Sequence, residues 1–401
     1  MMPSLSRTLA LSAVTLSSAL LAQAATWSRT ADIQGNGFFD AFDWFNERDP
    51  TNGLVTYQTV DAAKAAKLSY VDDNGAFVMG VSTVPVALEG RPSVRLQSKQ
   101  SYADGLYVLN VTHVPTGCSS WPAFWTVTEN IKSWPVGGEI DILENANDQY
   151  AAGLVSAHTQ STCLIDQNIP DAYGQVTYSN CSAYTEANSG CRVEMSNGPA
   201  PTWGADLNKA GGGVFAMERS FGSEGQGVKV WYFPNSDPSS LPKDLRAGST
   251  SANSDNFGKP YAHMPISDCH ADFGMHKIIF DITLCGDWAA NTYAESGCLA
   301  KYSACSYQVG YNGSSYSETY WAVDSLRLFT DGGDKANAAN SPNTAKPSTV
   351  AASSLATSTA KPSSGAAKSN SASSAASASV STPLTALAGA AALALGLQLL
   401  L

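Results

Sequence analysis

The stretch Gly137-Gly138-Glu139-Ile140-Asp141-Ile142-Leu143-Glu144-Asn145 places three carboxylates within six residues. Aliphatic residues separate the acids and a Gly-Gly turn signal precedes them, a pattern that favours a β-strand. Charged side chains are rare in an apolar strand unless the strand presents them for a chemical task. Two neighbouring carboxylates, one a nucleophile or base and the other a proton donor, are what glycoside hydrolysis requires.

The alternation of side chains along a strand decides which of these acids share a face. With a period of 2, Glu139 and Asp141 lie on one face and Glu144 lies on the other. A β-bulge at Ile142-Leu143 adds one residue and reverses the alternation beyond it. We therefore predict a bulge that turns all three acids toward one cleft and the aliphatic residues toward the core. The side chains must then converge, because a straight strand spans roughly 16 Å between the two glutamates, whereas a retaining glycosidase needs roughly 5–5.5 Å.

An isolated E-x-D-x-x-E run is more often a surface strand with solvated acids. The context favours a site here, because Trp121, Trp125 and Trp134 lie within 20 residues upstream of Glu139. Sugar rings stack their C–H faces on flat aromatic surfaces, so tryptophans beside carboxylates are typical of a carbohydrate cleft. Each tryptophan taken alone is more often a core residue.

Two motifs carry a resemblance to a known family. Residues 121–125 (W-P-A-F-W) and 137–147 (G-G-E-I-D-I-L-E-N-A-N) resemble family 16 glycoside hydrolases, specifically the fungal endo-1,3(4)-β-glucanases. The resemblance covers most of the body of the chain, with further blocks at residues 37–40, 49–53, 93–96, 155–159, 204–208, 213–218, 284–288 and 320–325.

The resemblance implies a role for each acid. Glu139 matches the nucleophile that forms a covalent glycosyl-enzyme, and Glu144 matches the general acid/base. Asp141 matches the assisting carboxylate between them. Its charge helps Glu144 to hold a proton, and a hydrogen bond from it can orient Glu139.

The resemblance also implies residues of the cleft wall. His158 matches a histidine that lines the same cleft, although a lone histidine is more often structural. The candidates for sugar stacking are Trp121, Trp125 and Trp288, of which the last two can equally be core residues. The acid motif with Leu143 as its inserted residue resembles the laminarinase-like branch, since fungal wall transglycosylases of the family resemble E-x-D-x-E without this insertion.

Short β-type runs dominate residues 25–331. The clearest lie at 106–111, 228–233, 277–282 and 322–329, separated by clusters of Gly, Asn, Asp and Pro, and only residues 60–68 indicate a short helix. Regular short strands predict an all-β two-sheet sandwich, and the resemblance makes it a concanavalin A-like β-jelly roll. The concave sheet of such a fold suits cleavage inside a long polymer.

Composition limits the partners. The chain has 401 residues, of which 14% are charged, and a formal net charge of −11. An acidic surface cannot neutralise phosphates, which excludes nucleic acid, but it is compatible with a neutral polysaccharide. The sequence holds no H-E-x-x-H, G-x-S-x-G or G-x-x-x-x-G-K motif. We expect no cofactor, no catalytic metal and a monomer, while a structural Ca²⁺ like that of some relatives stays open.

The two ends indicate processing and export. Residues 1–24 have the charge, apolar run and small-residue cleavage site of a secretory signal peptide. Residues 332–383 are rich in Ser, Ala and Thr, which predicts a disordered, O-glycosylated linker. Residues 384–401 are apolar and follow a polar spacer, as in a glycosylphosphatidylinositol (GPI) signal with Asn370 as the candidate attachment site. The alternative for this tail is an ordinary transmembrane anchor.

Export permits disulfides and glycans. Eight cysteines allow 105 pairings, of which Cys181–Cys191 and Cys298–Cys305 are expected because they are close in sequence. Zinc is less favoured than disulfides, because the spacings lack paired C-x-x-C motifs. The candidate glycosylation sites are Asn110, Asn180 and Asn312.

Three functions remain in order of preference. The first is a secreted, GPI-anchored endo-hydrolase that cleaves β-1,3 or mixed-linked β-1,3-1,4 glucans with retention of configuration, at the outer face of the plasma membrane or in the cell wall. The second is a cell-wall β-glucan or chitin transglycosylase, which the tail favours and the bulged motif opposes. The third is a non-catalytic glucan-binding jelly roll, which the presence of all three acids opposes.

Overall fold

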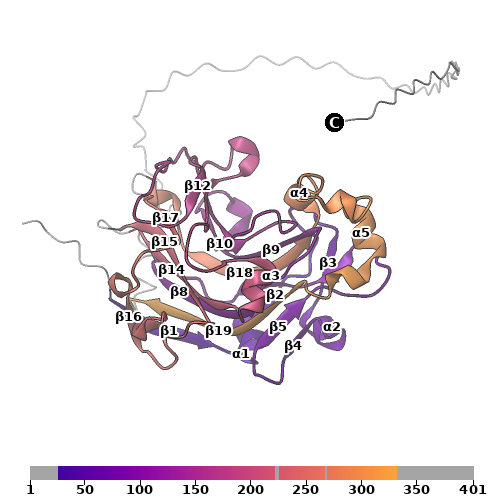
Figure 1. The fold of residues 1–401 in the computed structure, drawn as a ribbon, viewed down its shortest axis with the longest axis horizontal. Helices are drawn as coiled ribbons and strands as arrows, with labels where there is room; N and C mark the ends of the chain where they lie inside the picture. Colours follow the sequence, from indigo (N-terminus) through magenta and orange to yellow (C-terminus); the bar gives the residue numbers. More distant parts are fainter. Residues whose placement is uncertain (1–25, 222–224, 267–268, 332–401) are drawn as a thin grey trace, which may run out of the picture. The chain divides into compact units, whose positions relative to one another are not determined.

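Two antiparallel β-sheets pack face to face in the computed structural model, which describes residues 26–221, 225–266 and 269–331 (Figure 1). The predicted all-β sandwich is therefore confirmed. The signal peptide (1–24), the linker (332–383), the tail (384–401) and Asn370 lie outside the described residues.

The first sheet, called the back sheet, has nine strands in the described residues. Their order is β16-β1-β19-β8-β14-β15-β17, and β5 pairs with both β19 and β4. Their bounds are β1 Thr26–Ile33, β4 Ser69–Val71, β5 Phe77–Gly80, β8 Gly105–His113, β14 Gly213–Ser220, β15 Gly227–Pro234, β16 Ser251–Asn253, β17 Ala262–Met264 and β19 Tyr320–Thr330.

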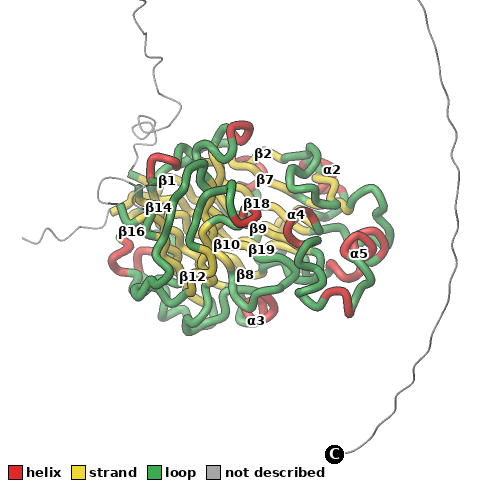
Figure 2. The backbone as a smooth tube through the Cα atoms, turned by 90° about the horizontal axis from the view of Figure 1, so that it is seen from above, coloured by secondary structure: helices red, strands yellow, loops and turns green. Residues whose placement is uncertain are grey.

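The second sheet, called the front sheet, has eight strands in the described part of the chain, in the order β12-β13-β11-β10-β9-β18-β7-β2. Figure 2 shows β12, β10, β9, β18, β7 and β2 following one another across the molecule. The strand that carries the acids, β10, lies inside this sheet. The bounds are β2 Phe42–Trp44, β7 Arg95–Ser98, β9 Ser120–Thr128, β10 Glu139–Glu144, β11 Leu154–His158, β12 Gln175–Tyr178, β13 Cys191–Glu194 and β18 His276–Leu284, with β3 Val55–Tyr57 and β6 Arg91–Ser93 as a separate parallel pair.

Helices are short and lie between the strands. The helix predicted at residues 60–68 is confirmed as α2, which starts at a Thr59 cap whose side chain accepts a hydrogen bond from the Ala62 N–H. Within the described residues, no helix is long and apolar enough to cross a membrane. The bounds are α1 Gly37–Ala41, α2 Val60–Ala65, α3 Gly204–Lys209, α4 Gly286–Ala289, α5 Cys305–Tyr311, η1 Ile131–Ser133, η2 Glu186–Asn188, η3 Lys243–Leu245, η4 Ser254–Asn256, η5 His270–Asp272, η6 Cys298–Ala300 and η7 Gly313–Tyr316, where η marks 3₁₀ helices.

The main core fills the space between the two sheets. Leu109 and Phe215 of the back sheet and Ile140 and Phe280 of the front sheet are buried in one cluster. Burial of each such side chain contributes about 1.5–3 kcal/mol. The four predicted strands are confirmed within β8, β15, β18 and β19.

Four disulfides link the described residues, and one of the two predicted pairs is wrong. Cys181–Cys191 is confirmed. Cys298 pairs with Cys118 beside β9, and Cys305 pairs with Cys285 at the end of β18, so the predicted Cys298–Cys305 bond does not form. The predicted pairing relied on closeness in sequence, but β9 and β18 are neighbours in the front sheet. The two disulfides therefore join the segment after β18 to the ends of both strands. The fourth disulfide is Cys163–Cys269.

The three candidate glycosylation sites occupy different surroundings. Asn110 lies in the middle of β8 and donates a hydrogen bond to Asp324. Asn180 adjoins a disulfide and its side chain accepts from the Ser182 N–H. Asn312 directly follows α5. Glycosylation at each of them stays a prediction.

Candidate active site

The predicted bulge lies in β10. Asp141 pairs with Trp125 of β9, but Leu143 pairs with the next residue, Phe124, so Ile142 is the extra residue. The pairing with β11 shifts over the same segment. The bulge is therefore confirmed, but its extra residue is Ile142 and not Leu143 as predicted.

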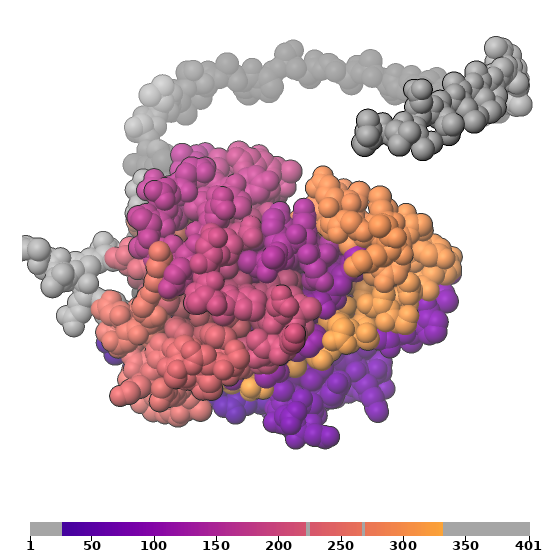
Figure 3. Space-filling model, viewed as in Figure 1, coloured from indigo at the N-terminus to yellow at the C-terminus, as the bar shows by residue number. Residues whose placement is uncertain are grey.

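The bulge separates the acids from the aliphatic residues. Ile140, Ile142 and Leu143 are buried in the main core. Glu144 pairs with Ala123 and Asp141 with Trp125, so these acids share the opposite face of the sheet, which we call the acid face. The space-filling view in Figure 3 shows a notch in the surface, between the magenta part from the middle third of the chain and the orange part near residue 300.

His158 joins the acids from the adjacent strand, as expected. It is the register partner of Glu139, and its Nε2 lies 3.3 Å from Asp141 Oδ2 and 3.9 Å from Glu139 Oε1. Its Nδ1 lies 3.0 Å from Asn188 Oδ1. Burial alone lowers the pKa of His158, but the hydrogen bond with Asp141 and the charges of the acids raise it to about 9. The ring is thus an imidazolium at neutral pH, with both N–H groups facing oxygen acceptors.

Asn188 was not predicted as a site residue. It lies in the loop that the Cys181–Cys191 disulfide closes. Glu186, Ala187 and Asn188 have successive φ angles of 49°, 53° and 63°. Left-handed backbone at non-glycine residues is strained by roughly 1–3 kcal/mol each and is concentrated at functional sites. The disulfide and the strained turn together hold the amide that orients His158.

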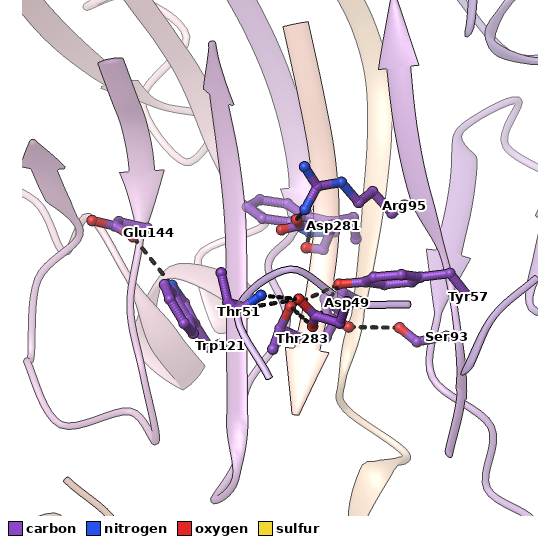
Figure 4. A network of polar contacts seen from close by, with 11 residues as sticks. Asp49, Thr51, Tyr57, Ser93, Arg95, Trp121, Glu144, Asp281 and Thr283 are labelled. Atoms are coloured by element: carbon purple, nitrogen blue, oxygen red, sulfur yellow. Dashed lines mark hydrogen bonds and ion pairs between the residues drawn. The ribbon is translucent and has the colours of Figure 1, made fainter. Parts of the chain in front are cut away.

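Glu144 is held by two donors. The Trp121 Nε1–H donates to Glu144 Oε2 at 3.2 Å (Figure 4), and the Ser156 hydroxyl donates to Oε1 at 3.0 Å. Burial and the nearby Asp141 charge raise the pKa of Glu144 to about 7, although Arg192 opposes the rise. A carboxyl group with this pKa can act as a general acid near neutral pH.

Glu139 interacts with the same groups. Burial, Asp141 and Glu144 raise the pKa of Glu139 to about 8, while His158 opposes the rise. Each glutamate makes it harder for the other to ionise, so the pair retains a proton near neutral pH. The arrangement can therefore supply one ionised carboxylate and one protonated carboxyl group, the two forms that acid-assisted nucleophilic displacement needs.

The three candidate tryptophans are neither fully buried nor fully exposed. Trp121 and Trp288 meet edge to face with ring centroids 5.5 Å apart. Trp125 shares the acid face with its register partner Asp141. Trp134, upstream of the acids, has its ring 6.4 Å from that of His158. Sugar stacking on Trp121, Trp125 and Trp288 stays a prediction.

A buried polar network beside Trp125 was also not predicted (Figure 4). Arg95 Nη1 lies 3.1 Å from Asp281 Oδ2, and the Arg95 guanidinium lies 5.1 Å from the centre of the Trp125 ring. Next to this ion pair, Asp49 accepts hydrogen bonds from Tyr57 and Thr283. The network gives Trp125 a polar and rigid support.

We expect Asp281→Ala to lower the free energy of unfolding by about 3–5 kcal/mol, because it leaves the Arg95 charge buried and unpaired. The matched control is Asp32→Ala, which removes the more exposed Arg29–Asp32 pair and should cost less than about 1 kcal/mol. Urea unfolding followed by tryptophan fluorescence measures both. Equal losses in the two variants contradict the expectation.

The free energy of unfolding should also fall as pH rises from 7 to 9. Glu139 and His158 have folded pKa values of about 8 and 9 against ordinary values of 4.5 and 6.5. Over this range the folded protein therefore holds protons that the unfolded chain has already released, so raising the pH favours unfolding. Urea unfolding at both pH values tests this, and the double variant Glu139→Gln/His158→Gln should show a weaker pH dependence. A wild-type stability that rises with pH contradicts it.

Glu139, Asp141 and His158 each place one potential ligand atom within 4.8 Å of the others. A metal needs the lone pair of a neutral imidazole, whereas the raised pKa of His158 keeps its ring protonated. The three residues therefore fit an ion-pair cluster better than a metal centre. The expectation that no cofactor is required stays a prediction.

Comparison with known proteins identifies the family of the chain. Residues 42–329 match the family described as "XgeA-like, catalytic GH16 domain". A probable glycosidase of Schizosaccharomyces pombe is 37% identical over 314 residues, which are 77% of this chain and 70% of that protein. A probable endo-1,3(4)-β-glucanase of Aspergillus fumigatus is 37% identical over 327 residues, 79% of this chain but only 47% of that protein.

Two solved structures are similar to this chain in both sequence and fold. Laminarinase 16A of Phanerochaete chrysosporium, with two β-glucans in its donor and acceptor sites, is 32% identical with a TM-score of 0.69, covering 76% of this chain and 100% of that one. A β-1,3-glucosyltransferase of family 16 that elongates its substrate is also 32% identical, with a TM-score of 0.67 and the same coverage. The chain belongs to glycoside hydrolase family 16, among its XgeA-like catalytic domains.

Proposed function

We propose that this protein is an endo-hydrolase that cleaves internal β-1,3 or β-1,4 bonds of β-1,3 and mixed-linked β-1,3-1,4 glucans with retention of configuration. One observation carries the proposal: the bulge at Ile142 turns Glu139, Asp141 and Glu144 to one face, beside a protonated His158.

The proposed reaction gives the two glutamates different roles. The Glu139 carboxylate attacks the anomeric carbon while Glu144 donates its proton to the departing glycosidic oxygen, which leaves a covalent glycosyl-enzyme. Glu144, now ionised, then removes a proton from water. The water oxygen bonds to the anomeric carbon and the Glu139 ester bond breaks, so configuration is retained after two inversions.

Asp141 and His158 support this cycle from the side. The His158 imidazolium donates to Asp141 and lies near Glu139, so its charge favours the ionised nucleophile. Asp141 opposes ionisation of Glu144, so the acid keeps its proton until the glycosidic oxygen needs it. Asp141 also raises the pKa of Glu139 and His158 also lowers that of Glu144, so the two residues act on a pair of glutamates that shares one proton near neutral pH.

The relatives support glucan as the substrate class. The Aspergillus fumigatus relative is named an endo-1,3(4)-β-glucanase, and the Phanerochaete chrysosporium laminarinase holds β-glucans. This chain spans about half the length of that Aspergillus relative, so its activity as a whole protein is our proposal. Transglycosylation is the second candidate, because the elongating glucosyltransferase is as similar as the laminarinase.

Product analysis tests the function. The purified protein is incubated with laminarin, lichenan and labelled laminari-oligosaccharide acceptors, and the products are separated by size. New reducing ends without labelled long products support the hydrolase. Labelled, lengthened products support the transglycosylase, and failure to cleave or transfer any β-glucan contradicts both.

The location of the enzyme is a separate proposal. The predicted signal peptide and GPI signal favour export and tethering outside the cell, and four disulfides suit an oxidising compartment. Treatment of intact cells with a phosphatidylinositol-specific phospholipase should release the enzyme. Retention on the cells after verified cleavage of other GPI proteins contradicts the anchor.

A further inference from the structure

Arg192 of β13 is a buried cation with few partners. Its exposed fraction is 8%. Its Nη2 lies 3.5 Å from the Ser189 carbonyl oxygen, at the outer limit of a hydrogen bond, and its Nε has no partner in the described structure. It also forms no ion pair with a carboxylate of the described residues, since each such pair involves another cation.

The other buried arginines have closer partners, although the Nε atoms of Arg95, Arg219 and Arg327 also lack a hydrogen-bond partner in the described structure. Arg91 donates to the carbonyl oxygens of three residues, and Arg327 donates to those of two. Arg95 and Arg219 pair with aspartates. A buried charge without such partners is costly, so a poorly satisfied one calls for a ligand as explanation.

Aromatic rings hold the Arg192 guanidinium in place. Its Cζ lies 4.8 Å from the ring centre of Trp288 and 5.3 Å from that of Tyr178. Cation–π contacts satisfy the charge in part but supply no hydrogen-bond acceptors to the N–H groups. The stacked rings thus fix the orientation of the guanidinium N–H groups, which can donate hydrogen bonds to a ligand rich in hydroxyl oxygens.

The position of Arg192 points to the substrate. Its register partner Ser156 donates to Glu144, which places Arg192 on the acid face. A second connection reaches the same glutamate, because Trp288 packs against Trp121 and Trp121 also donates to Glu144. Five separate segments, β9, β10, β12, β13 and α4, thus supply the cation, the rings and the acid.

We propose that Arg192 binds the glucosyl unit next to the scissile bond on the β13 side of the acids, donating N–H groups to its hydroxyl oxygens. Tyr178 and Trp288 hold the guanidinium for this purpose. The inference rests on the proposed function, because it identifies one binding position for the same neutral glucan. It also gives Arg192 a second role, since its charge opposes the rise in the pKa of Glu144.

The test compares Arg192→Met, Arg192→Lys and Arg327→Met. The last is the matched control, because Arg327 is buried to a similar degree but lies on β19 of the back sheet. For oligosaccharides long enough to fill the site, Arg192→Met should raise KM about 10- to 100-fold, the effect of losing one or two charge-assisted hydrogen bonds. Aryl glycosides in which the phenol takes the place of that glucosyl unit should show little change in KM. An Arg192→Met variant whose KM is unchanged, or rises equally for both substrate lengths, overturns the inference.

The pH profile separates binding from structure. Without the Arg192 charge the pKa of Glu144 rises, so Glu144 keeps its proton to higher pH and the alkaline limb of kcat moves upward in Arg192→Met. Arg192→Lys keeps the charge, so its limb should stay in place while its KM rises. If Arg192 only supports the structure, the alkaline limb of kcat should move equally in Arg192→Met and Arg192→Lys. That result overturns the inference.

Binding without turnover keeps this test independent of the proposed function. In a Glu139→Gln background, titration with laminarihexaose followed by tryptophan fluorescence gives Kd directly. Addition of Arg192→Met should raise Kd about 10- to 100-fold, whereas Arg327→Met should not. If the wild type cleaves β-glucan but Arg192→Met leaves Kd unchanged, the inference fails and the function stands. If the wild type cleaves no β-glucan, the function itself fails.

Discussion

Glu139→Ala should reduce the turnover of laminarin and lichenan by a factor on the order of 10³ or more, because it removes the group that forms the covalent intermediate. No neighbouring acid replaces it. Asp141 is engaged by His158, and Glu144 is held by Trp121 and Ser156. Reducing-end assays at matched protein concentration measure the loss. The control is Glu129→Ala, which changes an exposed glutamate beyond the end of β9 and should keep wild-type activity.

The nucleophile can also be identified by its replacement. In Glu139→Ala, azide can enter the space left by the carboxylate and attack the anomeric carbon of an activated β-glucoside from that side. A C–N bond forms, the C–O bond to the leaving group breaks, and one inversion gives an α-glycosyl azide. Proton NMR of the product reads the anomer. A β-glycosyl azide from this variant contradicts the assignment of Glu139.

Part of the site was predictable because it lies on one strand. Period-2 alternation allows Glu139 and Glu144 to share a face only if one extra residue lies between Asp141 and Glu144. The bulge was therefore predictable from parity alone. The identity of the extra residue was not predictable from parity, because it depends on the pairing with β9. There Leu143 lies opposite Phe124, and Ile142 has no partner of its own.

The rest of the site depends on which strands become neighbours. Ser156 donates to Glu144 and the Arg192 charge lowers its pKa, because β11 and β13 follow β10 in the front sheet. Side-chain patterns do not encode this order. Asn188 lies in a turn that a disulfide closes. The residue types of this turn do not predict its left-handed backbone. Its location between two cysteines is the one signal that pointed to an ordered loop.

The wrong disulfide has the same cause. Cys298 and Cys305 are close in sequence, yet each joins a strand end, Cys118 before β9 and Cys285 after β18. The two bonds fasten the segment that carries Trp288 against the strands that carry Trp121 and Asp281. Predicting these bonds therefore requires the order of the strands.

Glu144→Ala should separate the two halves of the reaction. For polymer, whose leaving group needs a proton, activity should fall about 10²- to 10⁴-fold. For an aryl glycoside with an acidic phenol as leaving group, formation of the glycosyl-enzyme should be nearly unaffected, because this phenol departs without protonation. Release by water should then be slow, since no base remains, and a burst of phenol followed by slow turnover is expected in stopped-flow absorbance.

Azide and pH complete the assignment of Glu144. Azide needs no base, so it should restore turnover of the aryl glycoside in Glu144→Ala and give a β-glycosyl azide, the opposite anomer to that from Glu139→Ala. The wild-type rate should fall as pH rises through about 7, where Glu144 loses its proton, and this alkaline limb should be absent in Glu144→Ala. Equal losses for good and poor leaving groups contradict a proton donor at this position. Both variants must give their opposite anomers, because the assignment requires that Glu139 and Glu144 act on opposite faces of one anomeric carbon.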